Sequence, residues 1–284
     1  MPPGGPVKWA VSNIGWRPDE QDDALALLAR SHVHGVETAP GLAFPSEADP
    51  LHPSRSSLDA FETKLDGHGL RPVSMQSLLF GDPQAQLFGD NAQRTRFEAR
   101  MRAAIDLAGR MKIANLVFGS PASRSLPPGR SSDTAGAEAL FRRLGEACLN
   151  AGCRLGLEAV TERSGTNFLN TTAAALAFVM RVDHPAIGLT LDTGAMFAND
   201  ETAAVLEIVD RHGRWISHVQ ISAPGLNGFP ADTDSLQCVL ERLRRSGYGG
   251  GVVSVEMRAG PGDNIEMLKT ALAICAALEV GPAG

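Results

Sequence analysis

The sequence alternates short apolar runs with amphipathic stretches along almost its whole length, and this rhythm limits the fold more than any other feature. Helical patterns such as Asp22–Arg30, Leu58–Gly69 and Arg94–Arg110 separate the runs, and a last helix spans roughly Asn264–Leu278. Strands that alternate with helices pair in parallel through crossovers, and a chain of 284 residues has room for eight such units. We therefore predict an α/β fold, a closed (β/α)8 TIM barrel. The eight expected strands are Val7–Ile14, Gly35–Thr38, Pro72–Ser77, Ile113–Gly119, Arg154–Val160, Ala186–Asp192, Ile216–Ser222 and Gly251–Met257.

An open doubly wound sheet is the alternative arrangement of the same elements. Such sheets usually carry a glycine-rich phosphate-binding turn after the first strand, where this chain has the sequence Ser-Asn-Ile-Gly-Trp-Arg.

No low-complexity linker divides the chain, so we expect one domain over residues 1–284, with residues 1–6 as a flexible N-terminus. The long loops Gly41–Ser57 and Pro121–Ser132 follow the second and fourth strands, on the side where barrel enzymes hold their active sites.

Composition excludes several classes of protein. The formal net charge of −6 and the lack of a basic stripe argue against nucleic acid as a partner. No apolar stretch is long enough to span a membrane, and the first residues lack the pattern of a signal peptide. The four cysteines form no CxxC pair, so we expect reduced thiols and a cytoplasmic protein.

Four consecutive strands carry a residue of a metal-binding type at or near their carboxyl ends. The residues are Glu158, Asp192, His218 and Glu256. An acid that closes an apolar strand is costly unless a partner neutralises it, and in a barrel all four would converge on the mouth. Each acid alone could simply cap its strand or pair with an arginine. On four consecutive strands they favour one divalent cation of the harder kind, such as Mn²⁺, Mg²⁺ or Co²⁺.

In this order and spacing, the four residues resemble the metal site of the xylose isomerase-like TIM-barrel superfamily, in its sugar phosphate isomerase/epimerase group and most closely the ketose 3-epimerases. The resemblance covers nearly the whole chain and extends to four further segments: 35–40, 74–77, 118–121 and 165–168. It implies one divalent metal, with Mn²⁺ first and Mg²⁺, Co²⁺ or Zn²⁺ as alternatives. It also implies a small carbohydrate substrate and suggests a homodimer.

The resemblance further implies proton transfer next to a carbonyl through a metal-stabilised enediolate, with Glu158 and Glu256 as the catalytic acid and base. Return of the proton to the other face gives epimerisation, and its delivery to the next carbon gives isomerisation. Loss of a β leaving group instead would give a lyase that cleaves a 3-keto glycoside or a related modified sugar. A non-catalytic sugar-binding barrel is the third hypothesis.

Three positions depart from the ketose 3-epimerase pattern. Ala195 stands where that group has a substrate-contacting His, Ser164 where it has a Glu, and Pro224 where it has an Arg. The predicted metal ligands are thus kept while the familiar substrate contacts are lost. This departure argues against a free hexulose as the only candidate substrate. The alternatives are a modified sugar, a nucleotide-linked or glycosidic sugar, or another polyol-like metabolite.

Five further residues are candidates for substrate binding: Glu37, Gln76, Trp16, Arg124 and Arg258. Each has an ordinary structural alternative, such as a salt bridge for Glu37 or loop packing for Trp16. Of the seven histidines, only His218 lies at the functional end of a predicted strand. This excludes the three-zinc endonucleases of the same superfamily, which need several histidine ligands.

Overall fold

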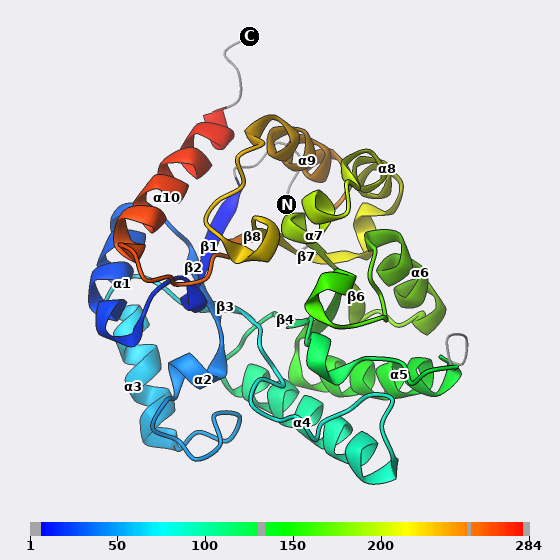
Figure 1. The fold of residues 1–284 in the computed structure, drawn as a ribbon. Coiled ribbons are helices and arrows are strands. Elements are labelled where there is room, and N and C mark those ends of the chain that lie inside the picture. The colour runs from blue at the N-terminus through cyan, green and yellow to red at the C-terminus, as the bar shows by residue number, and fades with distance from the viewer. Residues whose placement is uncertain (1–6, 130–133, 249–250, 281–284) are drawn as a thin grey trace.

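A computed structural model describes residues 7–129, 134–248 and 251–280, and it confirms the closed parallel barrel. Strands β1 to β8 pair in chain order, and the barrel closes where Ala10 of β1 lies in register with Ser254 of β8. Figure 1 looks along the barrel axis and shows the helices as a ring around the strands. The predicted flexible N-terminus, residues 1–6, and residues 130–132 of the predicted loop after β4 lie outside the described residues.

The strands are β1 Lys8–Ser12, β2 Gly35–Thr38, β3 Pro72–Met75, β4 Asn115–Phe118, β5 Arg154–Glu158, β6 Ile187–Asp192, β7 Ile216–Ile221 and β8 Val252–Val255. The helices are α1 Gln21–Arg30, α2 Pro40–Ala43, α3 Arg55–Asp66, α4 Asn91–Arg110, α5 Ala135–Ala151, α6 Thr172–Val182, α7 Thr193–Ala198, α8 Thr202–His212, α9 Thr233–Arg245 and α10 Asn264–Val280. The described residues also form six short 3-10 helices: η1 Asn13–Gly15, η2 Pro18–Glu20, η3 Pro121–Ser123, η4 Glu162–Ser164, η5 Gly213–Trp215 and η6 Pro224–Leu226.

Local capping explains where the helices differ from the predicted ranges. Helix α3 begins at Arg55, three residues before the predicted start, because the Ser54 side chain accepts a hydrogen bond from the Ser57 amide. Helix α4 is fixed by a capping box between Asp90 and Gln93. Strand β1 ends at Ser12 rather than at the predicted Ile14, because the chain turns into η1.

The apolar core lies between the strands and the helix ring. A row of phenylalanines under α4, α5 and α6 packs edge to face or tilted, with ring centroids 5.3–5.6 Å apart, and consists of Phe97, Phe118, Phe141, Phe178 and Phe168.

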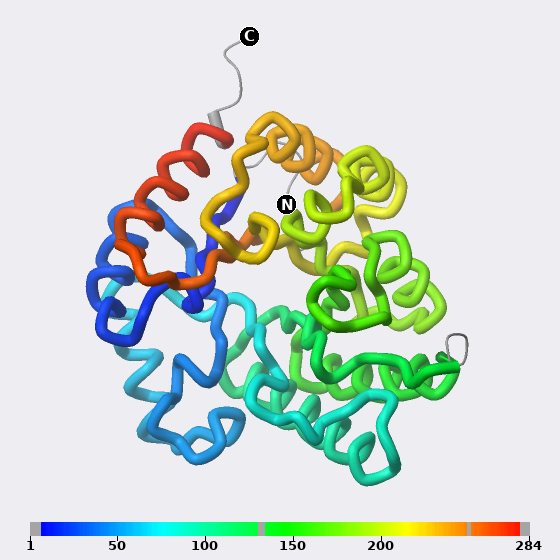
Figure 2. Tube along the Cα trace, in the orientation of Figure 1, coloured from blue at the N-terminus to red at the C-terminus, as the bar shows by residue number. Residues whose placement is uncertain are grey.

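Helix α10 packs beside α1, as Figure 2 shows, so the last unit meets the first and the ring is complete. Within the described residues, no helix is long and apolar enough to cross a membrane.

The inside of the barrel is polar or small rather than apolar. Alternate strand residues face inward, so Asp192 on β6, Gln220 on β7 and Ser254 on β8 share one row of the sheet register. All three are buried. A buried polar interior needs internal partners, and the arrangement of these partners determines what the barrel can bind.

Candidate active site at the carboxyl end of the barrel

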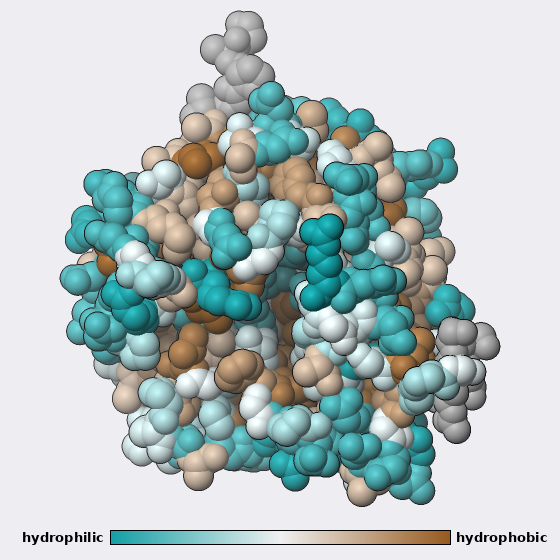
Figure 3. All heavy atoms as spheres, in the orientation of Figure 1, coloured by the Kyte–Doolittle hydropathy of each residue, from teal (hydrophilic) through white to brown (hydrophobic). Residues whose placement is uncertain are grey.

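A cavity of about 740 Å³ opens at the carboxyl ends of the strands. Figure 3 shows this face hollowed at its centre, with hydrophilic and hydrophobic residues around the rim. Its polar lining includes Gln76, Glu158, Asp192, Ser222, Glu256 and Arg258. This volume is typical of small-molecule sites.

Glu158 ends β5 and remains partly open to the cavity. Burial raises the pKa of Glu158 to about 8, and Asp192 repels its charge further, while the Arg124 guanidinium acts in the opposite direction. Gly119 on the neighbouring loop leaves the space that the Glu158 carboxylate occupies, since a β-carbon at position 119 would collide with Glu158 Oε2. The surroundings of Glu158 therefore favour its protonated form and fix the position of its carboxyl group at the cavity.

Asp192 ends β6 and is held by two hydrogen bonds. The Ala195 amide donates to Asp192 Oδ1 at 2.7 Å, so Asp192 caps α7, and the Ser222 hydroxyl donates to Oδ2 at 2.6 Å. Burial still raises the pKa of Asp192 to about 6, although these hydrogen bonds lower it. The carboxylate is thus oriented in the cavity but left without a cationic partner among the described residues.

Glu256 follows β8, and its amide donates to the Ile221 carbonyl at 2.9 Å. Burial raises the pKa of Glu256 well above its ordinary value, repulsion by Glu158 and Asp192 adds to this, and a hydrogen bond from Gln76 opposes it. Glu158, Asp192 and Glu256 therefore form a cluster of mutually repelling acids at the mouth. We call this set the carboxylate triad.

Gly119→Ala tests the close packing beside Glu158. The added methyl group should displace the carboxylate, and a misplacement of about 1 Å can cost on the order of 100-fold in rate. We expect kcat/KM to fall at least tenfold in a proton-exchange assay with a substrate of the wild-type protein. Gly136→Ala is the matched control, because a β-carbon there meets nothing within 4 Å. Equal activity of the two variants would contradict the role given to Gly119.

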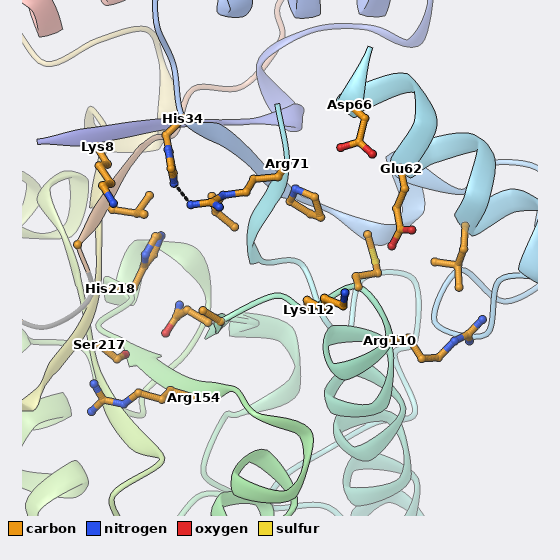
Figure 4. Close-up of a pocket in the computed structure, with 18 of the residues that line it drawn as sticks. Lys8, His34, Glu62, Asp66, Arg71, Arg110, Lys112, Arg154, Ser217 and His218 are labelled. Carbon is orange, nitrogen blue, oxygen red and sulfur yellow. Dashed lines mark hydrogen bonds between the residues drawn. The ribbon is translucent and has the colours of Figure 1, made fainter. Parts of the chain in front are cut away.

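His218 lies deeper in the barrel than the carboxylate triad. On β7 it precedes Gln220 by two residues, which places it one inward-facing position nearer the amino end. Its Nε2 is 2.7 Å from Glu37 Oε2 of β2, across the barrel, and both side chains are buried. Figure 4 shows His218 with Lys8 and Arg154 in a second cavity, at the amino end of the barrel. The structure thus does not bring His218 to the mouth cavity that the carboxylate triad lines.

Glu37 is an internal anion. Burial would raise its pKa, but the His218 charge and hydrogen bonds from His218, Gln220 and Ser74 lower the pKa of Glu37 below its ordinary value. The Gln220 amide nitrogen donates to Glu37 Oε1 at 2.8 Å. Glu37 therefore uses both carboxylate oxygens within the barrel, and its side chain does not line the mouth cavity.

His218→Leu should destabilise the fold, because it leaves Glu37 Oε2 buried without its hydrogen-bond partner. Breaking a buried pair from one side costs about 3–5 kcal/mol, which urea unfolding would measure. The double variant Glu37→Leu/His218→Leu should recover part of this loss, since it removes the stranded charge as well. A single variant that unfolds within about 1 kcal/mol of the wild type would show that the pair contributes little.

The other predicted substrate-binding residues divide into two groups. Gln76 and Arg258 line the mouth cavity. Trp16 does not: it is 5% exposed and packs in the core, beside a small void that Leu25 and Phe61 also line. Arg124 is fully buried and donates to the Glu158 carbonyl at 2.8 Å and the Leu169 carbonyl at 3.1 Å, so it braces the end of β5.

Three residues at or beside the mouth escaped sequence reasoning. Ser222 orients Asp192, and Gln220, which lies in register with Asp192, donates a hydrogen bond to Glu37. Phe80, in the loop after β3, lines the cavity although its side chain is 87% exposed, which is unusual for phenylalanine. A hydrophobic residue in a loop gives no periodic signal, so only its position at the rim marks it as a candidate for stacking on a ligand.

A divalent cation fits the mouth by donor chemistry. The carboxylate triad offers oxygen ligands whose raised pKa values a cation would lower, and the Gln220 Oε1 atom is buried without a hydrogen-bond partner among the described residues. As the side chains stand, no three His, Cys, Asp or Glu residues in the described ranges form a group that could hold a metal ion. The donors are present, but their side chains do not form a closed shell.

The fold and the cavity together define a (β/α)8 barrel whose mouth is lined by acids, the usual place for active sites in this architecture. The larger cavity at the amino end, about 950 Å³, lies on the face where barrels seldom catalyse. The chain belongs to the xylose isomerase-like TIM barrel family, whose model matches residues 25–278.

Three of the proteins that the chain resembles are sugar epimerases. A ketose 3-epimerase of Arthrobacter globiformis is 24% identical over 205 residues, which cover 72% of this chain and 69% of the relative. The crystal structure of D-allulose 3-epimerase from Methylomonas sp. in complex with D-allulose has a TM-score of 0.73 at 20% identity, covering 98% of this chain and 99% of that one. A 3-keto-D-glucoside 4-epimerase from E. coli has a TM-score of 0.73 at 16% identity, covering 95% and 99%. The two solved structures show that the fold is shared.

Proposed function

We propose that the protein is a divalent-metal-dependent isomerase or epimerase that moves a proton next to the carbonyl of a carbohydrate. The observation that carries the proposal is the pair Glu158 and Glu256, two acids that line one cavity from different strands. Two carboxylates at one cavity can act as general base and general acid on a substrate bound between them. One of the two would remove the carbon-bound proton, and the other would return it.

The surrounding residues supply binding and orientation. Asp192 would hold the cation together with the two glutamates, and Gln76, which bonds to Glu256, would steady that side chain as it changes charge. Arg258 lies at the cavity and could contact an anionic or hydroxyl group of the ligand. A bound cation would polarise the substrate carbonyl as a Lewis acid and so acidify the adjacent carbon.

The substrate is proposed to be larger or more modified than a free hexulose. Ser164 and Ala195 both line the cavity, where they leave room without imidazole or carboxylate contacts. The volume of about 740 Å³ and the exposed ring of Phe80 at the cavity favour a glycosidic or otherwise extended sugar. The same space would admit a leaving group, which keeps β-elimination from a 3-keto glycoside as the second candidate.

Deuterium exchange tests the function. Protein with Mn²⁺ is incubated in D₂O with keto sugars and with 3-keto glycosides, and NMR follows deuterium at the carbon next to the carbonyl. We expect exchange with epimerised or isomerised product. Release of the aglycone without such product would select the lyase. Metal bound but no exchange with any sugar would count against catalysis and favour a sugar-binding barrel.

A further inference from the structure

The side chain of Gln220 has a buried oxygen that forms no hydrogen bond with any described residue. The residue is fully buried on β7, yet Gln220 Oε1 has no hydrogen-bond partner among the described residues. A buried acceptor without a partner destabilises the folded protein, so it calls for an explanation. A ligand that is not part of the polypeptide is one such explanation.

Glu37 determines which way the Gln220 amide faces. A carboxylate can only accept hydrogen bonds, so the Gln220 nitrogen must point to Glu37 Oε1, 2.8 Å away. Reversing the amide would set two oxygens against each other. His218 Nε2 lies 2.7 Å from the other oxygen, Glu37 Oε2, so both carboxylate oxygens have a partner within the barrel. The free oxygen of Gln220 is therefore a fixed feature of the site.

The sheet register places this oxygen donor among the carboxylates. Gln220 lies in register with Asp192 on one side and with Ser254 on the other, and Glu256 follows Ser254 by two residues on the same inward face. His218 occupies the next inward position toward the amino end and is bonded to Glu37. In Figure 4 it lies with Lys8 and Arg154 around the amino-end cavity, among cationic groups that would disfavour a metal ion.

We propose that Gln220, and not His218, supplies the β7 ligand to the divalent cation, giving an oxygen-only shell with Glu158, Asp192 and Glu256. This inference rests on the proposed metal-dependent function and names the donor set of that site. His218 is then a positioning residue: it holds Glu37, and Glu37 holds the Gln220 amide. An oxygen-only shell favours Mg²⁺ or Mn²⁺, whereas an imidazole in the shell would raise affinity for Co²⁺ and Zn²⁺.

Metal titration of the EDTA-treated protein tests the assignment, with Mn²⁺ affinity read by calorimetry or by the EPR signal of free Mn²⁺. Gln220→Leu removes the oxygen and should weaken Mn²⁺ binding by about tenfold or more, a typical cost of disturbing a metal shell. His218→Gln is the matched control, because its amide can still donate to Glu37, and its Mn²⁺ affinity should stay within about threefold of the wild type. Gln220→His should raise the affinity for Co²⁺ relative to Mn²⁺.

The outcomes separate the two proposals. If His218→Gln loses Mn²⁺ binding while Gln220→Leu keeps it, His218 is the ligand and the inference is overturned, but metal dependence stands. If the wild-type protein binds no divalent cation at millimolar concentration, the metal-dependent function itself fails. If Gln220→Leu does not fold, as judged by circular dichroism in EDTA, the Co²⁺ to Mn²⁺ preference of Gln220→His decides. An unchanged preference there would overturn the assignment.

Discussion

Glu256→Gln is expected to reduce carbon-bound proton exchange by about 10²- to 10⁴-fold, the usual contribution of general acid–base catalysis. The amide keeps the shape of the side chain but cannot accept a proton. Glu158→Gln should have an effect of the same size, because the reaction needs one group to remove the proton and another to return it. Deuterium incorporation at saturating Mn²⁺ would measure both losses.

A glutamate on the protein surface provides the control for these two variants. Glu207→Gln, on the exposed face of α8, changes the same functional group where it only pairs with Arg211. It should retain full exchange activity. Metal affinity is measured alongside, because both catalytic candidates are also proposed ligands. If Glu158→Gln or Glu256→Gln bound Mn²⁺ and exchanged at the wild-type rate, the proposed acid–base pair would have to be abandoned.

The metal-free protein should lose stability as pH rises from about 4 toward 8. Burial and mutual repulsion raise the folded-state pKa of Glu158 to about 8 and of Asp192 to about 6, and they raise that of Glu256 as well. Groups whose pKa is higher in the folded state stabilise it while they are protonated, and that contribution disappears as pH passes through the folded pKa. Urea unfolding in EDTA should show a loss on the order of a few kcal/mol across this range.

A cation should reverse this trend. Mg²⁺ binds the ionised carboxylates, so added Mg²⁺ should raise the free energy of unfolding at pH 8 and have little effect near pH 4, where protons occupy the sites. The matched variant is Glu158→Gln/Asp192→Asn/Glu256→Gln, in which both the pH slope between 4 and 8 and the response to Mg²⁺ should flatten. A variant with the same slope as the wild type would show that the carboxylate triad does not control it.

The alternation of strands and helices predicted the closed barrel, because a parallel sheet of eight units has few ways to bury both of its faces. The sequence also identified Glu158, Asp192 and Glu256, since an acid that closes an apolar strand stands out. Their shared cavity follows from parallel pairing, which brings all the carboxyl ends to one face.

Side-chain roles within the barrel were not visible in the sequence. Arg124 resembles any loop arginine until the fold buries it against the end of β5. Trp16 resembles a stacking residue until the fold buries it beside Leu25 and Phe61. Gly119 matters only because Glu158 occupies the space beside it. Each role depends on contacts between residues far apart in the chain.

The sequence by itself thus determined the fold class, the family resemblance and the three acids at the mouth, because these depend on periodicity and on strand ends. Only the tertiary structure distinguished the roles of His218 and Gln220 inside the barrel. Both face inward on β7, two residues apart, and nothing local ranks one above the other as a ligand. Glu37, from the opposite side of the barrel, contacts His218 Nε2 and the Gln220 amide nitrogen, and it leaves the Gln220 amide oxygen free. These contacts across the barrel exist only after the sheet has closed, so the sequence alone could not distinguish the two residues.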